Sequence, residues 1–171
     1  YLLLHDGTFG SGIHAYKGDP AAATEYDTDP RVLPFRVHGE PPAHTLIIGS
    51  AGGNEIVAAL HFKSPKIEGV ELNPITVGLL KDELREFSGD LPNQPGVKIH
   101  QGDGRSFIFR SEDNYDLVWY VAPDSYAASN AASSGAFVLS ESYLYTSEMI
   151  AESLKHLTND GIMVVQFGEL D

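Results

Sequence analysis

The stretch that decides the fold is residues 44–60, HTLIIGSAGGNEIVAAL. The apolar run 45–48 predicts a short buried strand, and the residues that follow Gly53 predict a helix over about 53–62. Between them lies Gly49–Asn54, where glycine permits a sharp turn and lets the backbone approach a ligand closely. The free N–H groups at the start of the helix favour a carboxylate or a phosphate. The stretch therefore predicts a strand–turn–helix unit with a ligand at its turn.

Strand-like and helix-like runs alternate from His44 to the end of the chain, a pattern typical of parallel α/β sheets. Asn73 is a helix N-cap with Pro74 at the first helical position, and apolar residues continue at helical spacing as far as Phe87. We expect Asn159–Gly161 to stop the last helix before the last strand. The expected strands are 45–48, 66–71, 97–100, 115–121 and 162–167, and the expected helices are 53–62, 73–87, 105–110 and 146–157.

Residues 1–42 differ in texture from the rest, because glycines and prolines separate short apolar pieces. This pattern predicts a small β-hairpin followed by a loop segment. The expected organisation is a hairpin and loop over 1–42 and a Rossmann-like domain over 43–171.

Composition excludes several classes of function. The 24 acidic and 11 basic residues give a net charge of −13, which repels phosphate backbones, so no nucleic-acid partner is expected. The chain has no cysteine, and its seven histidines lack ligand spacing, so no metal site is expected. Without an apolar run of about 18 residues, this segment is not expected to enter a membrane. Because residue 1 is Tyr, we expect a fragment of a longer protein.

Two acidic residues, Glu71 and Asp103, lie at the ends of the two predicted strands that follow the glycine turn. Glu71 ends the second strand, 22 residues beyond Gly49, where a carboxylate can accept hydrogen bonds from ribose hydroxyls. Asp103 follows the third strand in QGDGR (101–105), where it can accept from an adenine amino group beside Gly104. Each residue also has a plain structural explanation, as a helix dipole partner or an ordinary turn residue. Because Ala51 and Asn54 interrupt the G-x-G-x-x-G pattern, NAD is disfavoured.

Together these motifs resemble the spermidine synthase-like branch of the class I S-adenosylmethionine (SAM)-dependent methyltransferases. The resemblance rests on IIGSAGG, VELNP, QGDGRSF, YDLV and DGIMVVQ, covers about residues 44–168, and includes the hairpin sequence LLLHDGTF. SGAFVLSESYLYTSE (134–148) is similar to a subgroup often attached to membrane-spanning segments. The resemblance implies a Rossmann-like methyltransferase sheet in which the five strands, numbered as they appear along the chain, lie in the order 3-2-1-4-5. The terminal strand pair of that sheet is expected to be missing here. It also implies that SAM or decarboxylated SAM is held by Gly49, Ser50, Ala51, Gly52, Gly53, Glu71, Leu72, Asp103 and Gly104.

The chain departs from spermidine synthases at two acidic positions. Their loop is similar to GGGDGG, with an Asp at the amino end of decarboxylated SAM, and this chain has Gly52 there. Their Asp-x-x-Asp-Pro motif, whose first Asp helps deprotonate the attacking amine, aligns with Val121 and Asp124. The candidate catalytic residues are therefore Asp124 and Tyr120, for which a turn role and a core role are the alternatives.

These departures favour a SAM-dependent methyltransferase acting on a small-molecule acceptor, since methyl transfer needs mainly proximity and alignment. The alternatives are a polyamine aminopropyltransferase that uses decarboxylated SAM and a non-catalytic SAM-binding domain of a larger membrane protein. The expected location is the cytoplasm, with attachment to a membrane-bound parent and assembly as a homodimer left open.

Overall fold

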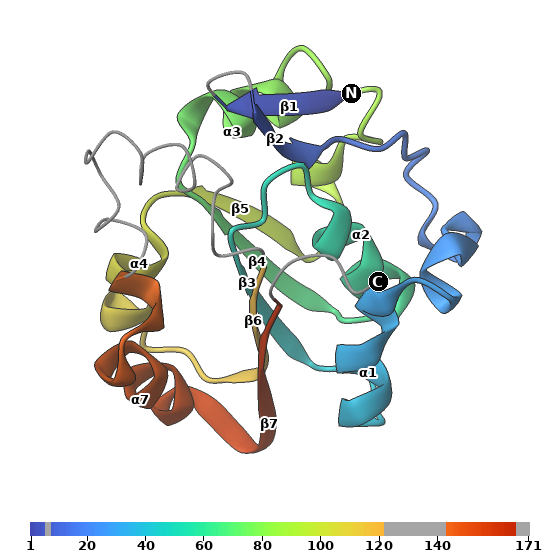
Figure 1. Ribbon diagram of the computed structural model, residues 1–171. Helices are drawn as coiled ribbons and strands as arrows, with labels where there is room; N and C mark the ends of the chain where they lie inside the picture. The colour runs from blue at the N-terminus through green and yellow to red at the C-terminus, as the bar shows by residue number, and fades with distance from the viewer. Residues whose placement is uncertain (6–7, 122–142, 167–171) are drawn as a thin grey trace.

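The computed structural model describes residues 1–5, 8–121 and 143–166 of the chain. Its centre is a parallel five-stranded sheet in the order β5-β4-β3-β6-β7 (Figure 1). This order confirms the predicted 3-2-1-4-5 arrangement. The strands are β3 (His44–Ile48), β4 (Lys66–Glu71), β5 (Val97–Gln101), β6 (Tyr115–Tyr120) and β7 (Leu157–Val165).

The central strands of the sheet are buried on both sides because helices cover both of its faces. All five residues of β3 are buried. The helices are α1 (Leu33–His38), α2 (Asn54–His61), α3 (Pro74–Lys81), α4 (Gly104–Arg110) and α7 (Ser147–Lys155). One core cluster joins α1 and α2 to Ile47 and Trp119, and the other joins α4 and α7 to Ile48 and Tyr120. None of the helices among the described residues is both long and apolar enough to cross a membrane.

The first 42 residues contain the expected hairpin but also more regular structure than expected. Strands β1 (Leu2–His5) and β2 (Thr8–Gly12) pair antiparallel, which confirms the hairpin. The expectation of a plain loop after it was wrong, because α1 and three short 3-10 helices follow: η1 (Pro20–Ala22), η2 (Thr24–Asp27) and η3 (Pro30–Val32). Helix α1 forms because its apolar side chains find a partner in the sheet: the ring of Phe35 packs edge-on against Trp119, with centroids 6.0 Å apart.

Helix α3 begins as predicted and ends earlier than predicted. The Asn73 side chain caps it by accepting from the N–H of Ile75 at 2.9 Å, with Pro74 at the first position. The helix ends at Lys81, so its extension to Phe87 was wrong. Phe87 instead contacts the N-terminal residue, since its ring packs edge-on against Tyr1 with centroids 4.8 Å apart. The apolar spacing beyond Lys81 therefore serves a turn that packs on the hairpin segment.

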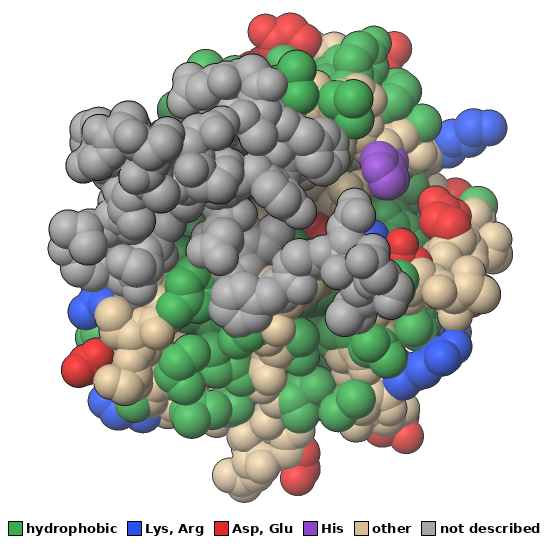
Figure 2. Space-filling model, viewed as in Figure 1, with side chains coloured by type: hydrophobic (Ala, Val, Ile, Leu, Met, Phe, Trp, Pro, Cys, Tyr) green, Lys and Arg blue, Asp and Glu red, His purple; other side chains and the backbone are tan. Residues whose placement is uncertain are grey.

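Strand β7 begins earlier than predicted. Asn159–Gly161, the expected stop before the strand, lies inside β7, at a register shift opposite Tyr115–Leu117. A Cβ at position 161 would lie 2.7 Å from the carbonyl oxygen of Tyr115, so glycine is required at this bulge. Apolar side chains gather on both sides of β7 (Figure 2).

Candidate cofactor-binding site

The glycine turn after β3 is shaped by its neighbours in the sheet. The N–H groups of Gly49 and Ser50 both donate to the carbonyl oxygen of Val70, at 2.9 and 3.1 Å. Gly49 has φ +80°, and a Cβ there would lie 2.8 Å from the carbonyl oxygen of Val121. Ala51 adopts φ +39°, which residues with a side chain adopt rarely. The turn therefore exposes backbone at the carboxyl end of β3, where open α/β sheets bind their ligands.

Glu71 holds this turn in place from the neighbouring strand. Its side chain is almost fully buried, and its Oε2 accepts from the N–H of Ala51 at 2.8 Å. Its Oε1 accepts from the N–H of Asn73 at 2.7 Å, at the start of α3. One carboxylate thus connects the glycine turn to the β4–α3 turn. Spacing in the sequence placed Glu71 near the turn but could not reveal these two hydrogen bonds. Leu72, the next residue, is 67% exposed at the rim.

The turn that contains Asp103 and Gly104 lies beside the glycine turn and Glu71. Asp103 caps α4, because its Oδ2 accepts from the N–H of Ser106 at 2.8 Å. The N–H of Gly102 donates to the carbonyl oxygen of Glu71 at 2.9 Å, which ties this turn to β4. Gly104 is buried, and a Cβ at that position would collide with the side chain of Ile48. The glycine turn, Glu71 and Asp103 therefore follow three adjacent strands, β3, β4 and β5, at one edge of the sheet.

Gly52 is covered by the segment that follows the hairpin. A Cβ at position 52 would collide with the carbonyl oxygen of Gly12 and lie 3.1 Å from the side chain of Ile13, which is fully buried. The Asn54 Nδ2 donates to the same carbonyl oxygen at 3.0 Å. The N-terminal segment and the turn thus form one packed unit, in which no side chain fits at position 52.

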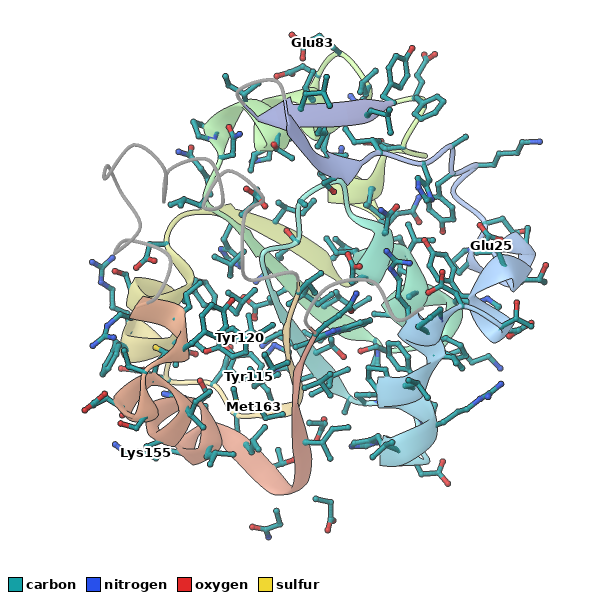
Figure 3. All side chains as sticks on the ribbon, viewed as in Figure 1. Glu25, Glu83, Tyr115, Tyr120, Lys155 and Met163 are labelled. Atoms are coloured by element: carbon teal, nitrogen blue, oxygen red, sulfur yellow. The ribbon has the colours of Figure 1, made fainter. Side chains whose placement is uncertain are left out.

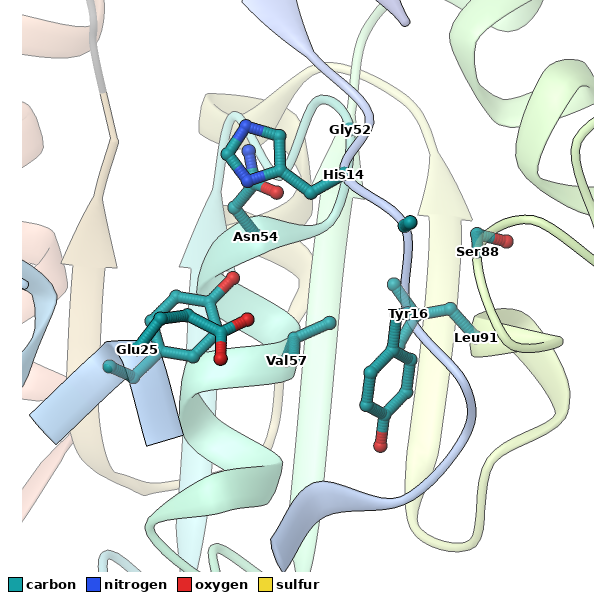
Figure 4. Close-up of a pocket in the computed structure, with 10 residues that line it drawn as sticks. His14, Tyr16, Glu25, Gly52, Asn54, Val57, Ser88 and Leu91 are labelled. Atoms are coloured by element: carbon teal, nitrogen blue, oxygen red, sulfur yellow. The ribbon is translucent and has the colours of Figure 1, made fainter. Parts of the chain in front are cut away.

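A cavity next to Gly52 is lined by His14, Glu25, Asn54 and Leu91, among others (Figure 4). Its volume of about 10 Å³ is enough for one water molecule. This cavity is therefore too small for a nucleoside. The exposed backbone above Glu71 and Asp103 is the surface available to a larger ligand.

Of the two predicted catalytic residues, Tyr120 is among the described residues. Asp124 lies outside the described residues. Tyr120 is 1% exposed, and its hydroxyl is 2.7 Å from the Ser153 Oγ of α7 (Figure 3). Burial raises the pKa of this phenol and outweighs the opposite effect of the hydrogen bond with Ser153. This geometry favours a packing role for Tyr120. Val121, in the place of a family Asp, is nearly buried and donates its N–H to Ile48.

Comparison with solved structures supports the fold. Spermidine synthase from Thermotoga maritima superposes with a TM-score of 0.62 at 18% identity, covering 92% of this chain and 46% of that one. Human methyltransferase-like protein 13 in complex with SAH superposes with a TM-score of 0.51 at 16% identity, covering 85% of this chain and 62% of that one. At these identities, the likeness shows a shared Rossmann-like architecture.

Comparison of sequences is more specific. The polyamine aminopropyltransferase of Streptococcus pneumoniae serotype 4 is 28% identical over 136 residues, covering 80% of this chain and 43% of the relative. That of Korarchaeum cryptofilum is 27% identical over 133 residues, covering 78% and 38%. The chain thus spans less than half the length of these relatives. Residues 33–170 match the family model of the spermine/spermidine synthase domain, and the chain belongs to that family.

Proposed function

We propose that this chain is the cofactor-binding part of an aminopropyltransferase that uses decarboxylated SAM and a small-molecule amine acceptor. The sequence favoured methyl transfer, but the relatives named polyamine aminopropyltransferase support the alternative better. The observation that carries the proposal is the convergence of the glycine turn, Glu71 and Asp103 at one edge of the sheet, in a chain of this family.

The residues present at this edge fit an adenosyl group. Each Glu71 oxygen accepts one backbone hydrogen bond, and a carboxylate oxygen has a further lone pair that a ribose hydroxyl could use. Among the described residues, the helix cap engages only Oδ2 of Asp103, which leaves Oδ1 for an adenine amino group. Glycine at 49 and 104 lets the two turns pack closely against Val121 and Ile48, which a side chain at either position would prevent. The bound sulfonium would supply an electrophilic carbon and a thioether leaving group.

The acceptor amine must be neutral to attack, although an alkylammonium has a pKa of about 10.4. A carboxylate that faces the acceptor would orient it and help remove its proton. Position 52 cannot hold such an acid, because the Gly12 carbonyl fills the space, and position 121 is valine. We therefore assign the task to Asp124. The net charge of −13 also suits a cationic acceptor.

Methyl transfer is the second candidate, because Gly52 stands where spermidine synthases carry the acid at the amino end of the cofactor. The N–H groups at the start of α2 would favour the carboxylate that SAM retains and decarboxylated SAM lacks. Membrane attachment, a cytoplasmic location and a homodimer stay predictions, of which the flanking gene sequence checks the first.

Two measurements test the proposal. Calorimetry with SAM and with decarboxylated SAM compares the two cofactors, and mass spectrometry follows product formation with each cofactor and putrescine. We expect tighter binding of decarboxylated SAM and an aminopropylated product. Tighter binding of SAM with no such product would favour the methyltransferase alternative. No binding of either would reject the cofactor site itself.

A further inference from the structure

A second cluster of polar side chains lies at the opposite end of the sheet from the glycine turn. His44 is the first residue of β3, Glu68 lies in β4, and Asp113 precedes β6. The His44 Nε2 is 2.9 Å from Glu68 Oε1, and one ligand atom from each of the three residues lies within 4.8 Å of the others. The side chains of His44 and Glu68 are only 10% and 7% exposed, whereas Asp113 is 53% exposed. The cluster is therefore buried on one side and open to solvent on the other.

The hydrogen bonds of His44 direct its Nε2 at the carboxylate of Glu68. The Nδ1 is 3.1 Å from the carbonyl oxygen of Asn114, which can only accept, so Nδ1 carries a proton. In a neutral ring, Nε2 then has a lone pair, and this lone pair would point at the carboxylate of Glu68. A metal ion bound beside the two atoms would accept this lone pair together with a lone pair of the carboxylate. An Nδ1–H bonded to a backbone carbonyl is also the arrangement that orients metal-bound histidines.

Lys66 provides a positive charge beside the cluster. Its Nζ is 3.0 Å from Asp113 Oδ2 and 3.5 Å from Glu68 Oε1. The lysine side chain is 43% exposed, so it can turn into solvent without leaving a buried charge behind. The Lys66 ammonium beside Glu68 and Asp113 can therefore be displaced by a metal ion. On the far side of Glu68, a hydrogen bond of 2.7 Å joins the His100 Nε2 to Oε2 of that carboxylate and holds it in place.

We propose that His44 Nε2, Glu68 Oε1 and Asp113 Oδ2 form a binding site for a divalent transition metal such as Zn²⁺. Imidazole and carboxylate are ligands that Zn²⁺ accepts, and three protein ligands leave the fourth position to water. Binding would engage His44 Nε2 as a neutral ligand and move Lys66 into solvent. The site is independent of the proposed transferase activity, since it lies at the amino ends of the strands. Sequence spacing could not indicate it, because the sheet assembles residues 44, 68 and 113.

The test is a calorimetric titration of the purified protein, without a polyhistidine tag, with ZnCl₂. We expect one site per chain, with affinity reduced by about tenfold or more in His44→Gln and in Asp113→Asn, the scale seen for disturbed metal ligation. Lys66→Met should bind more tightly than the wild type, because a competing charge is removed. His38→Gln, a histidine outside the cluster, is the matched control and should bind like the wild type. Tetrahedral Co²⁺, which absorbs visible light strongly, gives a second readout of the same site.

Two results would overturn the proposal. One is the absence of a single Zn²⁺ site in both the wild type and Lys66→Met while their thermal melts show a folded protein. The other is wild-type affinity in Asp113→Asn, whose exposed position allows it to fold even if a buried His44 variant does not.

Discussion

The carboxylate of Glu71 accepts a hydrogen bond from the N–H of Ala51 at 2.8 Å, across the gap between β4 and the glycine turn. Because Ala51 has φ +39°, this bond holds the turn in a conformation that an alanine adopts rarely. The residue expected to bind ribose therefore also shapes the turn beside it. Loss of Glu71 should affect the turn even when no cofactor is bound.

Glu71→Ala should weaken binding of decarboxylated SAM by about 1–3 kcal/mol, the scale of a lost charge-assisted hydrogen bond. It should also speed hydrogen exchange at the amides of Ala51 and Asn73 in the free protein, because both lose their acceptor. Calorimetry and exchange mass spectrometry measure the two effects. Glu83→Ala, at an exposed position, is the control. Unchanged exchange in Glu71→Ala would argue against the role in shaping the turn.

Gly52→Asp should destabilise the protein, although it introduces the acid that spermidine synthases carry at this position. The new side chain would collide with the Gly12 carbonyl, so we expect a loss of about 1–3 kcal/mol in the free energy of unfolding, the usual effect of overpacking. Urea denaturation measures it. Gly78→Ala is the matched control, since a Cβ there meets nothing within 4 Å and should be neutral or slightly stabilising. A Gly52→Asp variant as stable as the wild type would show that the N-terminal segment moves aside.

Asp124 and Tyr120 should separate cleanly in kinetics. Asp124→Asn should lower kcat for aminopropyl transfer by about 100-fold or more, while binding of decarboxylated SAM stays unchanged. Tyr120→Phe should leave kcat unchanged and cost about 1 kcal/mol of stability, because it loses only the hydrogen bond with Ser153. Steady-state assays with a thermal melt of each variant measure both. The reverse pattern would make Tyr120 the catalytic group.

His61 should make stability depend on pH. Its Nδ1 and Nε2 lie 2.8 Å from the Pro20 carbonyl and 2.9 Å from Asp27 Oδ1, so the ring donates twice only when it is protonated. Burial lowers the pKa of His61, but the hydrogen bonds with Asp27 and Pro20 outweigh it and raise the pKa above its usual value. The contribution to stability is therefore complete below about pH 6.5 and is lost as the pH rises through the raised value.

Urea unfolding of the wild type and of His61→Gln over a series of pH values checks this. The stability difference between them should shrink as the pH rises. His14→Gln, at an exposed histidine, should show no such trend. A difference that grows with pH would contradict the assignment.

Local features of the sequence determined much of the fold. The strand Lys66–Glu71 and the cap at Asn73 lie where predicted, because β-propensity, capping and proline chemistry act over a few residues. The alternation of strands and helices determined the sheet class, and the resemblance supplied the strand order. The carboxylate of Glu71 followed the glycine turn at a readable spacing, so its place in the candidate site could be predicted.

Only the tertiary structure decided features that join distant parts of the chain. Helix α3 ends at Lys81 and Phe87 packs on Tyr1, while Asn159–Gly161 enters β7 at a register shift opposite Tyr115–Leu117. The Gly12 carbonyl covers Gly52, and this contact excludes an acid that the sequence alone could only record as missing. His44 and Glu68 meet because β3 and β4 pair in parallel, with Leu46, two residues after His44, opposite Glu68. None of these contacts is encoded by spacing, because each depends on which segments the packed sheet brings together.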